Sequence, residues 1–112
     1  MKRIRSNYHN LHVLKDARPK LRRGILANSD KELVKSVGDC ALNVLQGNLK
    51  LSNCKKRKLR NYRRQLRTVS DGHVPLARKK KLIIQSGGFL FPLISVVLPT
   101  ITSLIYENFK SS

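Results

Sequence analysis

Hydrophobic residues recur at helical spacing in the middle of the chain. The segment from residue 30 to residue 46 carries most of its apolar side chains three or four positions apart, which predicts an amphipathic helix with one buried face. Ser29 and Glu32 form a capping-box pattern at its start. Gly47 follows the last apolar residue, where a left-handed glycine commonly ends a helix. We therefore expect a helix that begins near residue 30 and stops before Gly47.

A narrower apolar stripe predicts a second continuous helix after a cap at Ser52 or Asn53. The stripe consists of Leu59, Tyr62, Leu66 and Val69. Tyr62 could stack on a nucleic-acid base, but its position in the stripe favours a place in the core. The Asp71-Gly72 pair then predicts a turn. A last helix is expected over residues 76–84.

The N-terminal part offers little for burial. Residues 1–9 contain only Ile4 and Tyr8 as large apolar side chains, so we expect a disordered basic arm there. A short helix around residues 11–14 should stop before Pro19, because the residue preceding proline avoids the helical region. Pro19 suits the first turn of another short helix, around which Arg18, Lys20, Arg22 and Arg23 are arranged.

The C-terminal part has the opposite pattern. Residues 82–106 contain no charged side chain, and Pro92 and Pro99 are expected to interrupt a straight helix. The run from Phe89 to Tyr106 is long enough to span a bilayer, with the N-terminus cytoplasmic. Its prolines, glycines and hydroxyl side chains instead favour a broken or interfacial segment. Burial against a helical core is the third interpretation.

Together these patterns predict an all-α protein: a small basic helical domain of three to four short helices, with a disordered N-terminal arm and an apolar C-terminal segment. The expected boundaries are 1–18 for the arm, 19–86 for the helical domain, and 87–112 for a Gly-Gly junction and apolar segment.

Charge points to a polyanionic partner. The 112 residues include 24 Lys and Arg against 6 Asp and Glu, a formal net charge of +18. Such a chain repels itself unless a polyanion neutralises it. Nucleic acid is the first candidate, because each bound phosphate releases condensed counterions. An anionic membrane surface is the second.

Two cation clusters are the candidate nucleic-acid-binding residues. Eight cations surround the second apolar stripe, on what we expect to be one four-turn helix, and four more lie in the last helix. They are Lys55, Lys56, Arg57, Lys58, Arg60, Arg63, Arg64 and Arg67, then Arg78, Lys79, Lys80 and Lys81. No Asn or Gln pair stands among them as a base reader, so we expect binding of double-stranded DNA through its phosphates without sequence preference. RNA remains an alternative, and residues 55–58 also fit a nuclear-localisation tract.

Catalysis finds no support in the sequence. The acids are scattered, and the nearness of Ser70, Asp71 and His73 in the chain is no evidence for a triad, which a fold must assemble. The three histidines lack partners at ligand spacing, so neither a metal nor a cofactor is expected. Cys40 and Cys54 are expected to be free thiols in a reducing compartment. The basic N-terminus has no apolar run after it, so secretion is not expected.

One short motif adds a resemblance. The sequence Gly-Gly-Phe-Leu-Phe-Pro-Leu-Ile, residues 87–94, follows a Lys/Arg-rich body. It resembles the precursors of adenovirus core protein X, also called mu, and their relatives in adintoviruses and Maverick/Polinton elements. The resemblance implies a core protein that condenses viral DNA, in the virion or the host nucleus. It also implies cleavage by a viral cysteine protease at Gly87 and Gly88.

Overall fold

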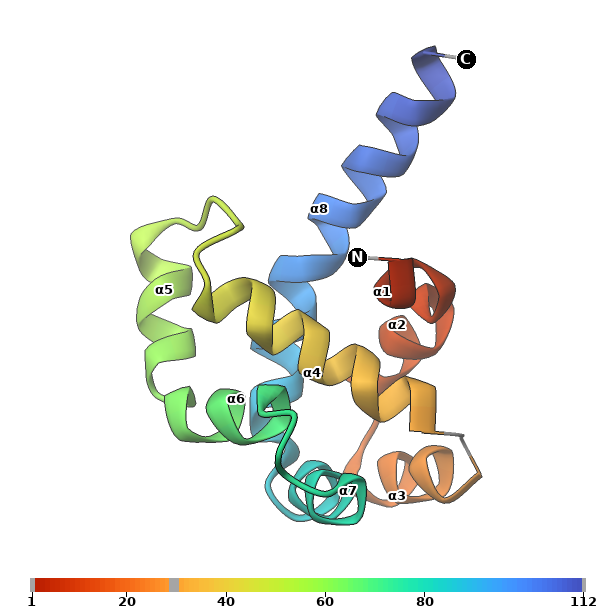
Figure 1. Cartoon of the computed structure of the whole chain (residues 1–112), viewed down its shortest axis with the longest axis vertical. Coiled ribbons are helices and arrows are strands. Elements are labelled where there is room, and N and C mark those ends of the chain that lie inside the picture. Colours follow the sequence, from red (N-terminus) through yellow and green to blue (C-terminus); the bar gives the residue numbers. More distant parts are fainter. Residues whose placement is uncertain (1, 29–30, 112) are drawn as a thin grey trace.

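The chain folds almost entirely into helices (Figure 1). The computed structural model describes the backbone of residues 2–28 and 31–111, and the side chains of residues 2–27 and 31–100. Within those ranges it contains eight α-helices, one 3₁₀ turn and no strand, so the all-α prediction is confirmed. The elements are α1 Lys2–Ser6, α2 Tyr8–Asp16, α3 Pro19–Asn28, α4 Lys31–Leu45, α5 Asn53–Arg60, α6 Arg63–Ser70, α7 Leu76–Gln85, η1 Gly87–Phe89 and α8 Leu90–Ser111.

Helix α4 is the centre of the fold. Figure 1 shows it crossing the molecule, with α5 and α6 on one side, α1 and α2 on the other, and α8 behind it. Its apolar stripe is buried as the spacing predicts. Gly47 has φ +72°, which confirms it as the left-handed residue after the helix. The expected cap at Ser29 and Asp30 lies outside the described residues.

A glycine sets the approach of α6 to α4. A Cβ atom at Gly38 would lie 2.5 Å from the carbonyl oxygen of Val69 in α6. Any larger residue would therefore hold the two backbones apart, although glycine weakens the interior of a helix. This contact fixes the position of α6 and, through the turn that follows it, of α7.

The N-terminal residues are not a disordered arm. They form α1 and α2, in which Ile4, Leu11 and Leu14 are completely buried. The prediction was wrong because it considered only the few apolar residues within 1–9 and not their packing against the rest of the core. Arg3 adds two ion pairs to α4, with Nε 3.1 Å from Oε2 of Glu32 and Nη1 3.0 Å from Oδ2 of Asp39.

The predicted number of helices was wrong, since the described chain contains eight and not three to four. The helix expected around the second stripe is broken, since α5 ends at Arg60 and α6 begins at Arg63. Tyr62, with φ −111° and ψ 18°, leaves the helical conformation at the break and packs against the core, as its stripe position predicts. The eight cations are divided between the two helices, five on α5 and three on α6.

The apolar C-terminal run is not a separate tail. Up to residue 100, where side chains are described, it is buried against the helical core, as the third interpretation expects. Its buried side chains are Phe89, Leu90, Leu93, Ile94, Val96, Val97 and Leu98.

The prolines do not interrupt α8 as expected. Pro92 lies in its first turn, where no backbone N–H is needed, and the helix continues past Pro99. The break comes earlier, between α7 and η1. No single helix in the described ranges is long and apolar enough to cross a membrane. Helix α7 and residues 87–100 pass that test only as a pair, bent by 80°.

Candidate nucleic-acid interface

The predicted cations of α5 and α6 all lie at the surface. Ser52 caps α5, since its Oγ accepts a hydrogen bond from the backbone N–H of Lys55 at 3.3 Å. This cap confirms the predicted start of the helix. Every one of the eight cations is exposed, while Leu59 and Leu66 beside them are buried. The two short helices thus separate charge from core completely.

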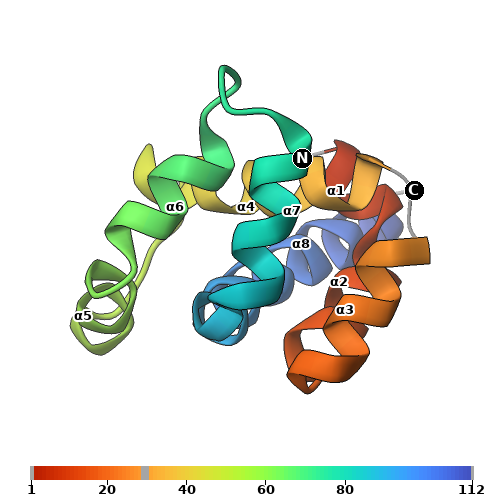
Figure 2. The same ribbon diagram turned by 90° about the horizontal axis from the view of Figure 1, so that it is seen from below.

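The turn after α6 brings the two predicted clusters together. Asp71 Oδ1 accepts the backbone N–H of His73 at 2.9 Å, which closes the turn predicted at Asp71-Gly72. This backbone hydrogen bond is the main cause that lowers the pKa of Asp71; the side-chain hydrogen bond from His73 and the charge of Lys79 act in the same direction. The carboxylate is therefore ionised when it holds the turn. Helix α7 then runs back beside α6 (Figure 2).

A groove between α6 and α7 joins the clusters. Its volume is about 330 Å³, and Arg64 of α6 faces Arg78 and Lys81 of α7 across it. Gln65, Thr68, Leu82 and Gln85 complete the lining. Three guanidinium and ammonium groups around one groove can each contact a phosphate oxygen. Sequence spacing alone could not place residues 64 and 78 together.

Three other cations surround a second hollow. Lys56, Arg60 and Arg63 line a space of about 250 Å³ whose other walls are mainly apolar. The remaining cations of α5 and α6, Lys55, Arg57, Lys58 and Arg67, are exposed outside these two spaces. The basic surface is thus a band along both helices and not a single site.

Two cations of the last helix are less accessible than the others. Lys79 is buried, with 7% of its surface exposed, and Lys80 is half-buried. Residue 79 lies on the face of α7 that packs inward, while Arg78 and Lys81 lie on the outer face. A duplex on this surface would therefore meet Arg78 and Lys81 and not Lys79.

Sequence reasoning did not include the cations of α3 in the site. Helix α3 packs against α7, and Figure 2 shows α6, α7 and α3 in a row. Lys20 and Arg23 are exposed on α3. Their clustering was visible in the sequence, but nothing there shows that α3 lies beside α7. The basic band extends over three neighbouring helices.

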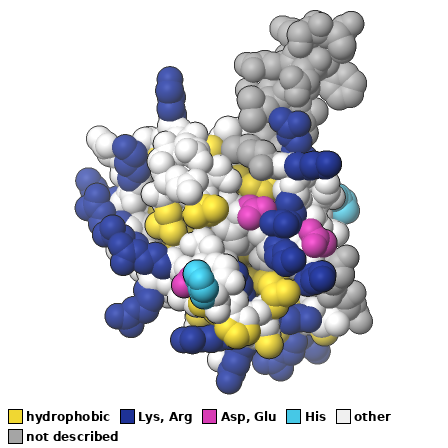
Figure 3. Space-filling view, viewed as in Figure 1, with side chains coloured by type: hydrophobic (Ala, Val, Ile, Leu, Met, Phe, Trp, Pro, Cys, Tyr) yellow, Lys and Arg dark blue, Asp and Glu magenta, His cyan; other side chains and the backbone are white. Residues whose placement is uncertain are grey.

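Few acids oppose this charge. Asp71 is the only Asp or Glu between residues 40 and 106, a stretch with 13 Lys and Arg. The ion pairs within the described chain join Arg3 to Glu32 and Asp39, Lys15 to Asp16, and His73 to Asp71, so none uses a predicted binding cation. Figure 3 shows Lys and Arg along the edge formed by α5 and around α7, and acids near the other side of α4.

The predicted cleavage site is folded. Gly87 is buried in η1, and the guanidinium of Arg22 from α3 occupies the space where a side chain at residue 87 would lie. Gly88 is exposed. A protease that needs an extended chain cannot bind this 3₁₀ turn while α3 covers it.

The other reactive side chains form no catalytic or metal centre in the described part of the chain. Ser70 Oγ donates to the carbonyl of Arg67 at 3.1 Å, and His73 Nδ1 lies 3.2 Å from Asp71 Oδ1 at a fully exposed ring, so these residues form no triad. No group of three His, Cys, Asp or Glu side chains gathers there. Cys40 and Cys54 are free thiols, and burial raises the pKa of Cys40 to about 12.

Comparison with known proteins finds no matching family model, no matching curated protein and no matching solved structure.

Proposed function

We propose that this protein binds and condenses double-stranded DNA through its phosphates, without sequence preference, and is not an enzyme. The observation that carries the proposal is the band of exposed cations on α5, α6 and α7, which no acid in the described residues pairs with. Cations that are not used inside the protein remain available for an external polyanion.

The binding energy would come mainly from counterion release. Eleven of the twelve predicted cations are exposed or half-exposed, all except Lys79. If about 6 to 8 of them each meet a phosphate, the affinity should fall by roughly three decades or more between about 50 and 200 mM salt. The cations lie along several helices, which suits contacts with a continuous backbone and gives no fixed set of base readers.

The resemblance at residues 87–94 extends this proposal to a setting. A core protein of a virus or virus-like element would act in the virion or the host nucleus. The protease implied by the resemblance would cut only molecules in which Arg22 has moved away from Gly87 and the 3₁₀ turn has opened.

The test is a charge-matched comparison. The variant Arg64→Gln, Arg78→Gln, Lys81→Gln removes the groove cations, and Lys2→Gln, Arg5→Gln, Lys31→Gln removes the same charge from exposed positions on α1 and α4. We expect the groove variant to flatten the slope of log affinity against log salt by about three, equally for duplexes of different sequence, and the control to change it much less.

Equal losses for both variants would show that net charge acts without a defined surface. An unchanged slope in the groove variant would refute the assignment. Binding to anionic vesicles but not to duplex DNA in dilute buffer would favour the membrane surface as partner.

A further inference from the structure

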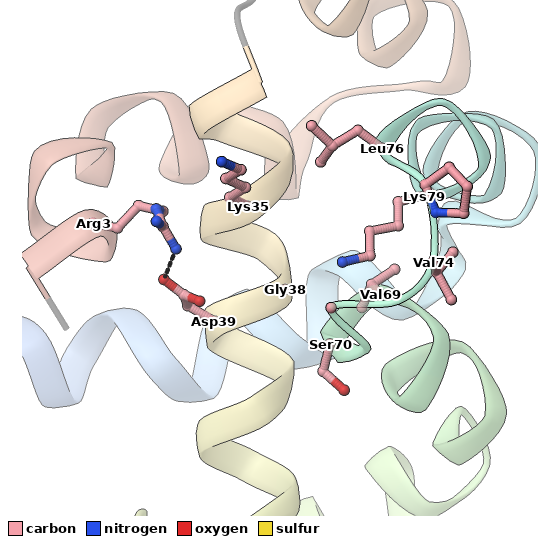
Figure 4. A pocket seen from close by; sticks show the side chains of 11 residues that line it. Arg3, Lys35, Gly38, Asp39, Val69, Ser70, Val74, Leu76 and Lys79 are labelled. Atoms are coloured by element: carbon pink, nitrogen blue, oxygen red, sulfur yellow. Dashed lines mark hydrogen bonds and ion pairs between the residues drawn. The ribbon is translucent and has the colours of Figure 1, made fainter.

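A pocket separate from the basic groove lies at the opposite end of α7. It has a volume of about 460 Å³ and lies between α1, α4, the end of α6 and the first turn of α7 (Figure 4). Its lining residues are Arg3, Lys35, Gly38, Asp39, Val69, Ser70, Gly72, Val74, Pro75, Leu76 and Lys79. Of the cations predicted from sequence, only Lys79 lines it.

Lys79 is the unusual residue of this pocket. It is 7% exposed, and Figure 4 shows its ammonium reaching from α7 toward α4, between Leu76 and Val69. No hydrogen bond or ion pair is formed by this ammonium within the described chain. The Lys79 side chain is covered along its length, while its ammonium keeps access to the open pocket. An anion that enters the pocket would therefore meet an unpaired positive charge.

The acids near the pocket are already engaged. Asp39 accepts a hydrogen bond from Arg3 Nη1 at 3.0 Å. Asp71 accepts the backbone N–H and lies beside the ring of His73. Lys79 lowers the pKa of Asp71 only through its charge, without a hydrogen bond. Lys35 of α4 lines the pocket on the side nearer Arg3, away from Lys79 (Figure 4).

Backbone N–H groups at the start of α7 also favour an anion. Helix α7 has ten residues, and Pro75 at its N-cap has no side-chain oxygen to accept the first N–H groups. The N–H groups of Leu76 and Ala77 are therefore uncapped, and Leu76 lines the pocket. Uncapped N–H groups and the positive end of the helix dipole favour an anion at this position.

We propose that this pocket binds a phosphate group, held by the ammonium group of Lys79 and by the N–H groups that open α7. The pocket is larger than one phosphate, and Val69, Val74 and Leu76 form apolar walls for whatever the phosphate is attached to. The phosphate can belong to a small phosphorylated molecule or to a nucleic-acid backbone. The site does not depend on the α6–α7 groove.

The experiment uses the full chain and reads the site directly. Inorganic phosphate is titrated at constant ionic strength while the backbone amide resonances of Leu76 and Ala77 are followed by NMR. We expect saturable shifts in the wild type and about tenfold weaker binding in Lys79→Met, since one charge-assisted contact is lost. Lys50→Gln removes the same charge from an exposed position outside the pocket and should leave the phosphate affinity unchanged.

Lys79→Gln keeps a polar side chain at the same position and provides a second variant, which should also weaken phosphate binding. Absence of saturable shifts in the wild type, or equal affinities for Lys79→Met and Lys50→Gln, would overturn the proposal. Repeating the titration with phenyl phosphate and with a short duplex distinguishes the sources. Shifts of the same amides by the duplex indicate a backbone phosphate, and shifts by phenyl phosphate alone indicate a small ligand.

Discussion

At the scale of single residues, Gly38 has the clearest consequence for stability. Its Cα hydrogen faces the Val69 carbonyl, and backbone cannot move away as a flexible side chain would. We expect Gly38→Ala to lower the free energy of unfolding by about 1 to 3 kcal/mol, as overpacking does. Urea denaturation followed by circular dichroism measures this.

Gly24 in α3 is the matched control for that substitution. A Cβ atom there meets nothing within 4 Å, so Gly24→Ala should gain up to about 1 kcal/mol from helix propensity alone. If Gly38→Ala stabilised the protein as much as Gly24→Ala, that result would contradict the close backbone contact between α4 and α6.

The two cysteines should differ in reactivity. Desolvation is the main cause that raises the pKa of Cys40 to about 12, with a smaller contribution from the charge of Asp39, so its thiol carries almost no thiolate at pH 8. Cys54 is exposed at the start of α5. Alkylation at pH 8, located by mass spectrometry, should modify Cys54 rapidly and Cys40 only in denaturant. Equal rates in the folded protein would contradict the burial of Cys40.

At the scale of helices, α2 tests whether the N-terminal part belongs to the core. Leu11 is completely buried, so Leu11→Ala should cost about 2 to 5 kcal/mol of the free energy of unfolding. Val13 is 39% exposed on the same helix, and Val13→Ala should change stability by about 0.5 kcal/mol. Thermal unfolding of both variants measures the difference, and a disordered arm would leave both unchanged.

The helices that sequence predicted well are those whose periodicity and end signals agree. For α4 and α7, spacing, Gly47 and the Asp71-Gly72 turn located the elements within a few residues, and the Ser52 cap located the start of α5 but not its end at Arg60. Helix α1 could not be predicted in this way, because Ile4 and Arg3 are stabilised by residues far along the chain. Local pattern carries no information about such contacts.

The candidate site also has some features that the sequence predicts and others that it does not. Exposure of the α5 and α6 cations follows from their place around an apolar stripe, which the sequence shows. The groove around Arg64 and Lys81, the burial of Lys79 and the neighbouring α3 depend on how α7 packs. Those features require the tertiary structure, in which two faces of one short helix meet different neighbours.

At the scale of the whole molecule, the net charge of +18 should itself limit stability. Unpaired cations on neighbouring helices repel each other, and salt screens that repulsion over a Debye length of about 8 Å at physiological ionic strength. We expect the Tm to rise by about 5 °C when NaCl is increased from about 50 to about 500 mM. Differential scanning calorimetry gives the Tm.

The groove variant serves as the control for this experiment, because it has three fewer charges in one place. Its Tm should be higher than that of the wild type at low salt and should rise less with added NaCl. A wild-type Tm that falls with NaCl would show that attraction, not repulsion, dominates the charged surface.

The guanidinium above Gly87 ties the exposure of one peptide bond to the docking of a whole helix. Arg22 leaves that position when its side chain rotates or when α3 separates from α7, and α3 itself carries cations that a polyanion would hold. Limited digestion at the Gly-Gly bond would thus report how often Gly87 is uncovered, and a bound polymer that holds α3 and Arg22 in place would slow the cut without touching the glycines.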